Sequence, residues 1–251
     1  KQPSGLSPEA ENLPNLVPGY YRNLCIGKDP EWIKVYVEGK YGFVIDGQVV
    51  FPNFNEYLHV AESVLTPVAN LPVILGFDFG VRNPACIFGQ YLPNGRLNVL
   101  DECVSTNMGI RQFIQHTVKP LILTKYPRYA VVATGDPAGV KRSDSDERTC
   151  YQEVRDQGIQ ALPAWSNSIE ARVNAVNEFL TRTVLSRGAM QISPSCVVIR
   201  KGFAGGYHYR RLQKSGDASF YNIPEKNQYS HPMDALQYLA MYWDTIMRRQ
   251  K

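Results

Sequence analysis

From Leu71 onward, short runs of apolar residues alternate with longer segments in which apolar residues recur every three or four positions. Val73–Phe79 is a nearly continuous apolar run, which is typical of a strand buried on both faces of a sheet. Two further apolar segments flank the turn Pro93-Asn94-Gly95-Arg96 and are therefore expected to pair as an antiparallel hairpin. The predicted strands are Val73–Phe79, Ala85–Tyr91, Leu97–Val104, Tyr129–Thr134 and Ile159–Leu162.

Helical spacing marks the segments between and after these strands. The clearest predicted helix has one apolar stripe, formed by Ile169, Val173, Val176, Leu180 and Val184. The predicted helices are Ile110–Tyr126, Thr149–Gln157, Ile169–Leu185 and Pro232–Arg249. A β-meander that leads into βαβ crossovers predicts an α/β fold, in which helices flank both faces of a mixed sheet. Because several folds share this order, the architecture alone does not name a function.

The first 70 residues have a different pattern, with seven prolines and few long apolar stretches. A short helix is predicted around Pro30–Val37, and a hairpin is predicted to pair Tyr41–Ile45 with Gln48–Phe51 across Asp46-Gly47. We interpret residues 1–70 as a connector or the tail of a preceding domain, and residues 71–251 as one compact domain. Since the chain starts at Lys1 without a methionine, we expect it to be a piece of a longer protein.

Composition limits the function classes without selecting one. The 251 residues are 44% hydrophobic and 20% charged, which favours a folded domain over a disordered chain or a coiled coil. No apolar run approaches the length of a membrane span, so no membrane partner is expected. The five cysteines include no CxxC pair, which argues against a structural zinc site or a disulfide framework. The net charge of +4 permits a nucleic-acid partner but does not require one.

Two aspartates stand at the ends of predicted buried strands. Asp78 follows the apolar run Val73–Phe77, and Asp136 follows Ala130–Gly135. If these strands are parallel neighbours, about 4.8 Å apart, the two carboxylates can bracket a divalent cation. Like charges at that distance require a cation or a shared proton. The alternative is that each aspartate merely caps the turn that follows its strand.

A third aspartate opens the last predicted helix. Pro232 suits the first helical position, which makes His231 the predicted N-cap and puts Asp234 in the first turn. The helix dipole alone would stabilise an acid there, without any function. The functional interpretation is that Asp234 reaches the same ion, with His231 on the same face as a further ligand or a general base. For His231 the alternative is a plain helix cap.

Oxygen ligands without a cysteine cluster favour Mg²⁺ or Mn²⁺ over zinc. Three carboxylates at one edge of a sheet suit a two-metal-ion site, whose ions lie about 3.5–4 Å apart and bind the attacking and leaving oxygens of a phosphodiester. The predicted metal ligands are therefore Asp78, Asp136 and Asp234, and the predicted catalytic residues are these three and His231.

A glycine-punctuated basic stretch between Ser193 and Asn227 is the candidate DNA-binding segment. Its candidate residues are Arg200, Lys201, Arg210, Arg211 and Lys214. Contacts from such a segment to phosphates would position a duplex without reading its sequence. The alternative is a solvated loop with incidental charge, since Asp217 and Glu225 dilute the patch.

Three motifs together resemble the acidic motifs of the large terminase nuclease, the DNA-cutting part of the packaging motor of tailed bacteriophages. They are Gly76-Phe77-Asp78-Phe79-Gly80, Gly135-Asp136-Pro137-Ala138-Gly139 and His231-Pro232-Met233-Asp234-Ala235-Leu236-Gln237-Tyr238. The N-terminal segment is similar to the stretch that joins the packaging ATPase to that nuclease. The matching pieces there are Ser7-Pro8-Glu9-Ala10-Glu11-Asn12, Gly19-Tyr20-Tyr21 and the run from Asp46-Gly47 to Phe51-Pro52. The resemblance thus spans nearly the whole chain, and its last motif is the distinctive one.

This resemblance implies a ribonuclease H-like fold and metal-dependent cleavage of concatemeric double-stranded viral DNA in the host cytoplasm, headful or site-directed. It also implies the portal protein and the small terminase subunit as partners, and an ATPase domain earlier in the same full-length chain. The chain contains no GxxxxGK[ST] motif, so residues 1–70 are interpreted as the linker after that ATPase domain.

Two other function classes remain open. Another ribonuclease H-like enzyme, of the resolvase or transposase type, would keep the metal chemistry and change the substrate. A non-catalytic docking module of a packaging motor would retain the acids only structurally. Asp78-Phe79-Gly80 is also found in actin-like ATPases and protein kinases, but neither a second glycine-rich phosphate turn nor an HRD-type loop accompanies it.

Overall fold

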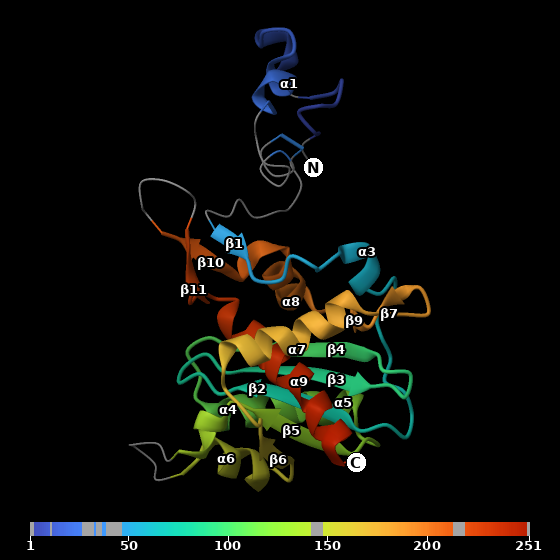
Figure 1. Cartoon of the computed structure of the whole chain (residues 1–251), viewed down its shortest axis with the longest axis vertical. Helices are drawn as coiled ribbons and strands as arrows, with labels where there is room; N and C mark the ends of the chain where they lie inside the picture. Colours follow the sequence, from blue (N-terminus) through green and yellow to red (C-terminus); the bar gives the residue numbers. More distant parts are fainter. Residues whose placement is uncertain are drawn as a thin grey trace.

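The computed structural model describes residues 3–10, 12–26, 33, 37–38, 47–141, 148–212 and 219–249. Its centre is a six-stranded mixed sheet with helices on both faces (Figure 1). In spatial order the strands are β6 (Gln160–Pro163), β5 (Val131–Gly135), β2 (Val73–Asp78), β3 (Ala85–Tyr91), β4 (Leu97–Val104) and β9 (Met190–Ile192). β2, β3 and β4 form an antiparallel meander, whereas the β2–β5, β5–β6 and β4–β9 pairs are parallel. The predicted α/β architecture is therefore confirmed.

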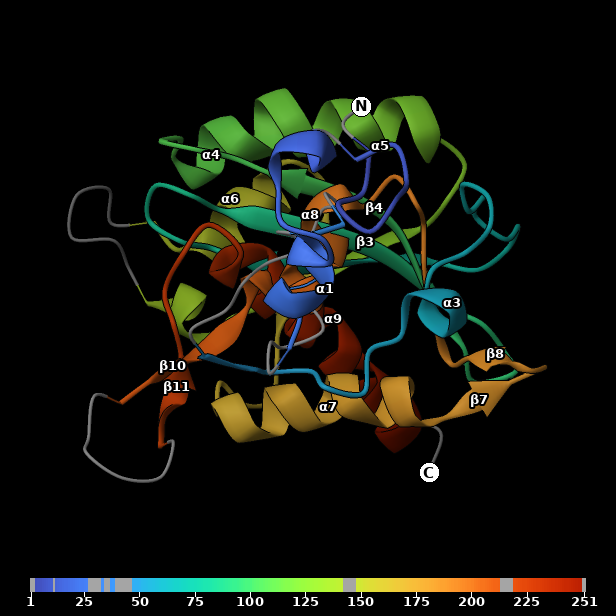
Figure 2. The same cartoon turned by 90° about the horizontal axis from the view of Figure 1, so that it is seen from above.

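Helices cover each face of the sheet over a separate apolar core (Figure 2). One face carries α4 (Ile110–Phe113), the π-helical turn η2 (Ile114–Val118), α5 (Lys119–Lys125) and α6 (Cys150–Asp156). The other carries α7 (Ile169–Thr181) and α9 (Ser230–Arg249). The alternation of β2 explains the two cores, because Leu75 and Phe77 pack on the first face and Ile74 on the second.

Helix α9 lies directly on β2 because Gly76 has no side chain. A Cβ atom at Gly76 would come within 2.3 Å of the Ala235 carbonyl oxygen. Gly89 on β3 permits the same approach, since a Cβ there would lie 2.8 Å from the side chain of Leu239. This close packing holds the first turns of α9 beside the carboxyl end of β2.

Most predicted elements of the central domain are confirmed, and the hairpin of β3 and β4 has the predicted bounds. The predicted helix Ile169–Leu185 is too long, because α7 ends at Thr181. Leu185 and Ser186 adopt left-handed backbone conformations, with φ of 51° and 62°. They form the turn of a small hairpin between β7 (Thr183–Val184) and β8 (Arg187–Gly188). The apolar spacing that predicted the helix therefore extends beyond the residue at which the helix ends.

No helix or strand was predicted in the basic stretch between Ser193 and Asn227, but the structure there is mostly regular. It contains α8 (Val197–Lys201), η4 (Gly202–Gly206), β10 (His208–Arg211) and β11 (Phe220–Pro224). β10 pairs with β11 on one side and with β1 (Gly47–Val49) on the other, in a second, three-stranded sheet. The predicted hairpin arm 41–45 and its turn residue Asp46 lie outside the described residues, as does most of the predicted helix 30–37.

Residues 47–70 pack against the central domain. Phe51 is buried and its ring contacts Phe203 and Tyr207, with centroids 5.3 and 6.1 Å apart. The short helix α3 (Glu56–His59) lies near β8 and β9, and Val60 bridges to Ile192. The predicted domain boundary near residue 70 stays a prediction. Further towards the N-terminus, the structure has η1 (Leu13–Asn15) and α1 (Tyr20–Leu24).

Among the described residues, no helix is both long and apolar enough to cross a membrane.

Candidate active site

The first two predicted aspartates lie at matched positions on neighbouring parallel strands. Phe77 of β2 is paired with Gly135 of β5, so Asp78 and Asp136 follow directly from a paired position. The backbone N–H of Asp136 donates to the Phe77 carbonyl over 3.3 Å. Because alternate residues of a strand face the same side, both aspartates belong with Gly76 to the face that α9 covers. The predicted adjacency of these two strand ends is confirmed.

Each of these carboxylates is held through one oxygen by a backbone amide two residues further on. Oδ1 of Asp78 accepts from the N–H of Gly80 at 2.9 Å, and Oδ1 of Asp136 accepts from the N–H of Ala138 at 2.8 Å. Oδ2 of Asp78 lies 3.3 Å from Nδ1 of His231. Oδ2 of Asp136 has no hydrogen bond or ion pair among the described residues. Two hard oxygen donors are thus available at this end of the sheet.

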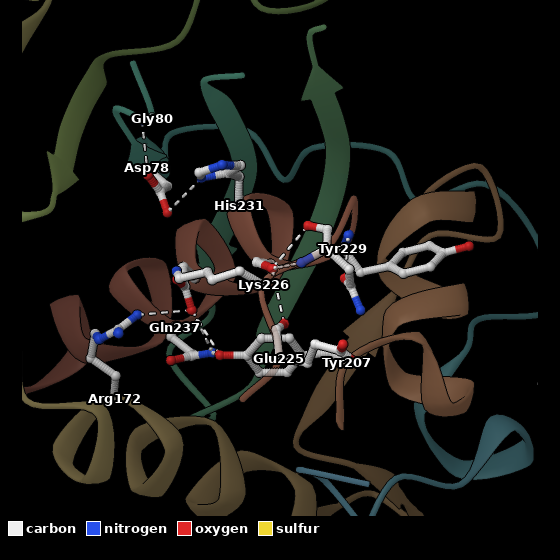
Figure 3. A network of polar contacts seen from close by, with 12 residues as sticks. Asp78, Gly80, Arg172, Tyr207, Glu225, Lys226, Tyr229, His231 and Gln237 are labelled. Atoms are coloured by element: carbon white, nitrogen blue, oxygen red, sulfur yellow. Dashed lines mark hydrogen bonds and ion pairs between the residues drawn. The ribbon is translucent and has the colours of Figure 1, made fainter. Parts of the chain in front are cut away.

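His231 is positioned by α9 above the loop that follows β2 (Figure 3). A Cβ atom at Gly80 would come within 2.7 Å of the imidazole ring, so the glycine makes room for the histidine. The neighbouring Asp78 carboxylate raises the pKa of His231 above its usual value, despite the opposing effect of partial burial. With Nδ1 turned towards Asp78, Nε2 is the ring nitrogen left for exchange with a water or a substrate.

The prediction that His231 caps the last helix is wrong. Helix α9 begins at Ser230, so His231 is its second residue and Asp234 its fifth. The chain turns into the helix through Asn227 and Ser230. The N–H of Asn227 donates to Ser230 Oγ at 2.7 Å, and the N–H of Tyr229 donates to Asn227 Oδ1 at 2.9 Å. These two side chains thus stabilise the turn that precedes α9, where the position of Pro232 predicts His231 as the cap.

Asp234 has a different environment, since it is only 4% exposed and lies within a polar network. Its Oδ1 atom pairs with the Arg172 guanidinium at 3.0 Å and accepts from the Tyr207 hydroxyl at 2.8 Å. Gln237 donates to the same oxygen over 3.4 Å, and Lys226 Nζ lies 3.1 Å from Oδ2. This network satisfies the carboxylate that would otherwise be buried alone.

The three aspartates surround one tyrosine but do not form a closed cluster. Burial raises the pKa of Tyr238; Arg172 lowers it, and the carboxylates of Asp136, Asp78 and Asp234 each raise it further. All three carboxylates therefore lie within electrostatic range of this ring. Among the described residues, however, no three His, Cys, Asp or Glu side chains converge closely enough to hold a metal ion. Direct ligation of one cation by all three stays a prediction.

A polar cleft of about 680 Å³ opens beside His231. Two lysines, Lys201 and Lys226, line it together with His231, and the described lining contains no acidic side chain. The remaining lining residues are Asn83, Val104, Ser105, Thr106, Val198, Asn227, Gln228, Tyr229, Ser230 and Pro232. Glu102 orients its α8 wall by accepting from the N–H groups of Val198 and Ile199. Positive charge and hydrogen-bond donors give this cleft the character of a phosphate-binding surface.

The structure separates the five predicted DNA-binding residues. Lys201 lines the cleft, and Arg211 is exposed on β10. Arg210 lies over the ring of Tyr221 at 4.9 Å, whereas Arg200 pairs with Glu56. Lys214 lies outside the described residues.

Sequence reasoning missed the network around Asp234. Lys226, Tyr207, Arg172 and Gln237 were not identified from the sequence. Two of them carried a readable signal: Arg172 is a charged residue beside the apolar stripe of α7, and Gln237 follows Asp234 by three positions on one helix face.

No family model and no curated protein matches this sequence. Two solved structures share its fold. The nuclease domain of the phage P22 large terminase has a TM-score of 0.53 and 14% identity, over 82% of this chain and 95% of that domain. The large terminase nuclease of the thermophilic phage G20c, with bound magnesium, has a TM-score of 0.51 and 14% identity, over 78% of this chain and 97% of that chain. The sequence resemblance is thus confirmed at the level of structure, and the chain has the ribonuclease H-like fold of the phage large terminase nuclease domains.

Proposed function

We propose that this chain is a metal-dependent endonuclease that cleaves concatemeric double-stranded viral DNA during genome packaging. The observation that carries this proposal is the pair Asp78 and Asp136. They end adjacent parallel strands, each is fixed by a backbone amide, and Asp78 also contacts His231, which lines a cleft together with two lysines. Two ordered carboxylates next to a surface suited to phosphates are what phosphodiester hydrolysis requires.

Carboxylate oxygens are donors that suit Mg²⁺ or Mn²⁺. Asp78 and Asp136 would hold the ion through their Oδ2 atoms, and Asp234 would join them through the oxygen that now faces Lys226. When bound, one or two such ions supply Lewis-acid activation of the scissile phosphate and of the attacking water. The fold relative from phage G20c carries bound magnesium.

The surrounding residues would orient this site and its substrate. Arg172, Tyr207 and Gln237 fix the rotamer of Asp234 through Oδ1. His231 would exchange a proton at Nε2, since its Nδ1 faces Asp78. Lys201 in the cleft and the exposed Arg211 would bind phosphates on either side of the cut. Among the other candidates, Arg210 and Lys214 would extend this contact, and Arg200 would contribute least because Glu56 neutralises it.

The biological setting follows from the family resemblance. The chain would act in the host cytoplasm, joined to the ATPase domain of its full-length chain through residues 1–70 and assembled with a portal protein and a small terminase subunit. Residues 71–251 would be the nuclease domain.

Nicking of supercoiled plasmid by the purified chain tests the proposal. We expect cleavage that requires Mg²⁺ or Mn²⁺, is abolished by EDTA, and falls at least about a hundredfold in Asp78→Asn and Asp136→Asn. Lys125→Met, at the far end of α5, is the matched control and should cleave normally. Preferential cutting of four-way junctions over duplex would indicate a resolvase-type enzyme instead. Metal-independent nicking would contradict the proposed metal chemistry, and no nicking at all would leave the non-catalytic docking module.

A further inference from the structure

The two oxygens of Asp234 are held by groups that differ in burial. Oδ1 faces the interior, where Arg172 and the hydroxyl of Tyr207 contact it and are themselves buried. Oδ2 is contacted by a residue of the cleft lining. Among the described residues, Lys226 is the group that contacts it, at 3.1 Å. The Lys226 side chain is 69% exposed, whereas that of Asp234 is 5% exposed.

This difference in exposure suggests that the contact of Asp234 with Arg172 is permanent and that its contact with Lys226 can be broken. Arg172 already supplies one positive charge to the buried carboxylate, and its side chain is only 8% exposed. Lys226 supplies a second charge from the solvent side, on a flexible stem that precedes the turn Asn227–Ser230. An exposed ammonium is readily hydrated when it leaves, so little opposes its departure. The inner contacts would keep the Asp234 rotamer unchanged meanwhile.

Lys226 also links Asp234 to the cleft, because it lines the cleft and contacts Oδ2. It lines the cleft together with His231, whose ring contacts Asp78. Two residues of the same cleft lining, Lys226 and His231, thus contact Asp234 and Asp78 respectively. A divalent ion and a lysine ammonium compete for the same lone pairs, since both are cations that take carboxylate oxygens.

We propose that Lys226 is a tethered cation that occupies Asp234 Oδ2 in the metal-free protein and must be displaced before this carboxylate can ligate a divalent ion. Lys226 is then a positioning residue that sets the metal affinity of the site. This inference rests on the proposed function, because it takes Asp234 as a metal ligand. Its consequence is the reverse of what a cleft lysine would ordinarily do, since removing it strengthens metal binding.

The test is Mn²⁺ binding to the whole chain without DNA, by calorimetry at fixed ionic strength. We expect Lys226→Met to bind Mn²⁺ roughly two- to fivefold more tightly than the parent chain, as for loss of one exposed ion pair. Lys226→Arg should restore the parent affinity, because it keeps the charge. Lys201→Met is the matched control: it removes a lysine from the same cleft without a contact to Asp234, and its affinity should stay at the parent value.

Equal or weaker Mn²⁺ binding by Lys226→Met overturns the inference, and so does equal tightening by Lys201→Met, which would indicate a general charge effect. Asp78→Asn, measured in parallel, separates this failure from that of the proposed function. If the parent binds Mn²⁺ and Asp78→Asn does not, an unchanged Lys226→Met defeats the inference alone. If neither the parent chain nor Asp78→Asn binds Mn²⁺, both proposals are contradicted.

Discussion

The negative charges of the two aspartates on strands and of the aspartate on the helix are stabilised in different ways. Asp78 and Asp136 are partly buried, and each uses a backbone amide to fix one oxygen. Asp234 is buried, and it is neutralised by Arg172 and Lys226. The strand pair thus relies on backbone amides, with His231 beside Asp78, whereas the helix residue is paired with two cationic side chains.

The difference follows from where each backbone can supply donors. A strand that ends in a tight turn exposes the N–H groups of the next residues, and these bind the carboxylate directly. In the interior of a helix the N–H groups are already bonded to preceding carbonyls, so a buried carboxylate on Asp234 must find side-chain partners. The comparison predicts that removing a side-chain partner of Asp234 lowers the free energy of unfolding, whereas changing Asp78 itself has little effect on it.

The largest expected effect is the loss of Arg172. Arg172→Met leaves Asp234 buried with one inner charge removed, and breaking a buried pair from one side lowers the free energy of unfolding by about 3–5 kcal/mol. Urea unfolding at neutral pH measures this change. The double variant Arg172→Met/Asp234→Asn should recover much of the loss, because no unpaired charge remains. A single variant as stable as the parent chain would show that Lys226 alone satisfies the carboxylate.

Asp78→Asn is the matching change on the strand side. The amide oxygen still accepts from the Gly80 N–H, and a negative charge is removed from beside Asp136. We expect the metal-free melting temperature to stay within about 2 °C of the parent value or to rise, which corresponds to at most about 0.5 kcal/mol. A fall as large as that in Arg172→Met would contradict the distinction between the two environments.

An effect smaller than that of Arg172→Met is expected at Gly80, which makes room for His231. An alanine there places its Cβ 2.7 Å from the imidazole, so the ring must move away from Asp78. We expect Gly80→Ala to lower stability by about 1–3 kcal/mol and to shift the His231 ring resonances in NMR spectra. Gly109→Ala is the control, because a Cβ at that position meets nothing within 4 Å. Unchanged His231 resonances in Gly80→Ala would contradict the packing described.

The pattern of apolar residues predicted five strands of the central sheet, whose apolar runs are long enough to recognise, and it missed the three-residue edge strand β9. It overran the helix α7, since Val184 fits the stripe while Leu185 and Ser186 adopt left-handed conformations that apolar spacing does not encode. It missed the sheet of β1, β10 and β11, in which Gln48 lies opposite Tyr209 across more than half of the chain. Such long-range pairing of polar strands leaves little periodic signal.

The candidate site divides in the same way. Asp78 and Asp136 could be found from sequence, because a carboxylate at the end of a buried strand is unusual and its position along the strand is set by the apolar run. Lys226 and Tyr207 could not, since nothing in their local sequence says that they meet Asp234. The fold brings them together from separate segments, and only the geometry distinguishes Lys226 from the other lysines of the basic stretch.

The free energy of unfolding is expected to depend on pH through His59, a buried side chain whose polar partners among the described residues are backbone groups. Its Nδ1 accepts from the Asn55 N–H and its Nε2 donates to the Leu180 carbonyl, so the ring is held neutral. Burial lowers its pKa below the usual 6.5. The stability from the neutral ring is therefore present above pH 6.5 and is lost as the pH falls below it. The free energy of unfolding should fall less between pH 7.5 and 5.5 in His59→Gln than in the parent chain; equal slopes would contradict this.

The smallest effects are expected for single contacts to DNA, and they distinguish basic residues that are free from those that are paired. Lys201 lines the cleft and Arg211 is exposed on β10, whereas Arg200 is neutralised by Glu56. Each phosphate contact releases counterions, so losing one reduces the slope of log affinity against log salt by about 0.9 for duplex DNA. Lys201→Ala and Arg211→Ala should each reduce the slope by about this amount, equally for unrelated sequences. Arg200→Ala, matched in charge, should leave it nearly unchanged. A salt series of duplex affinities measured in EDTA would decide this. A loss in Arg200→Ala equal to that of the other two would mean that DNA displaces Glu56, and the paired arginine would then belong to the contact surface.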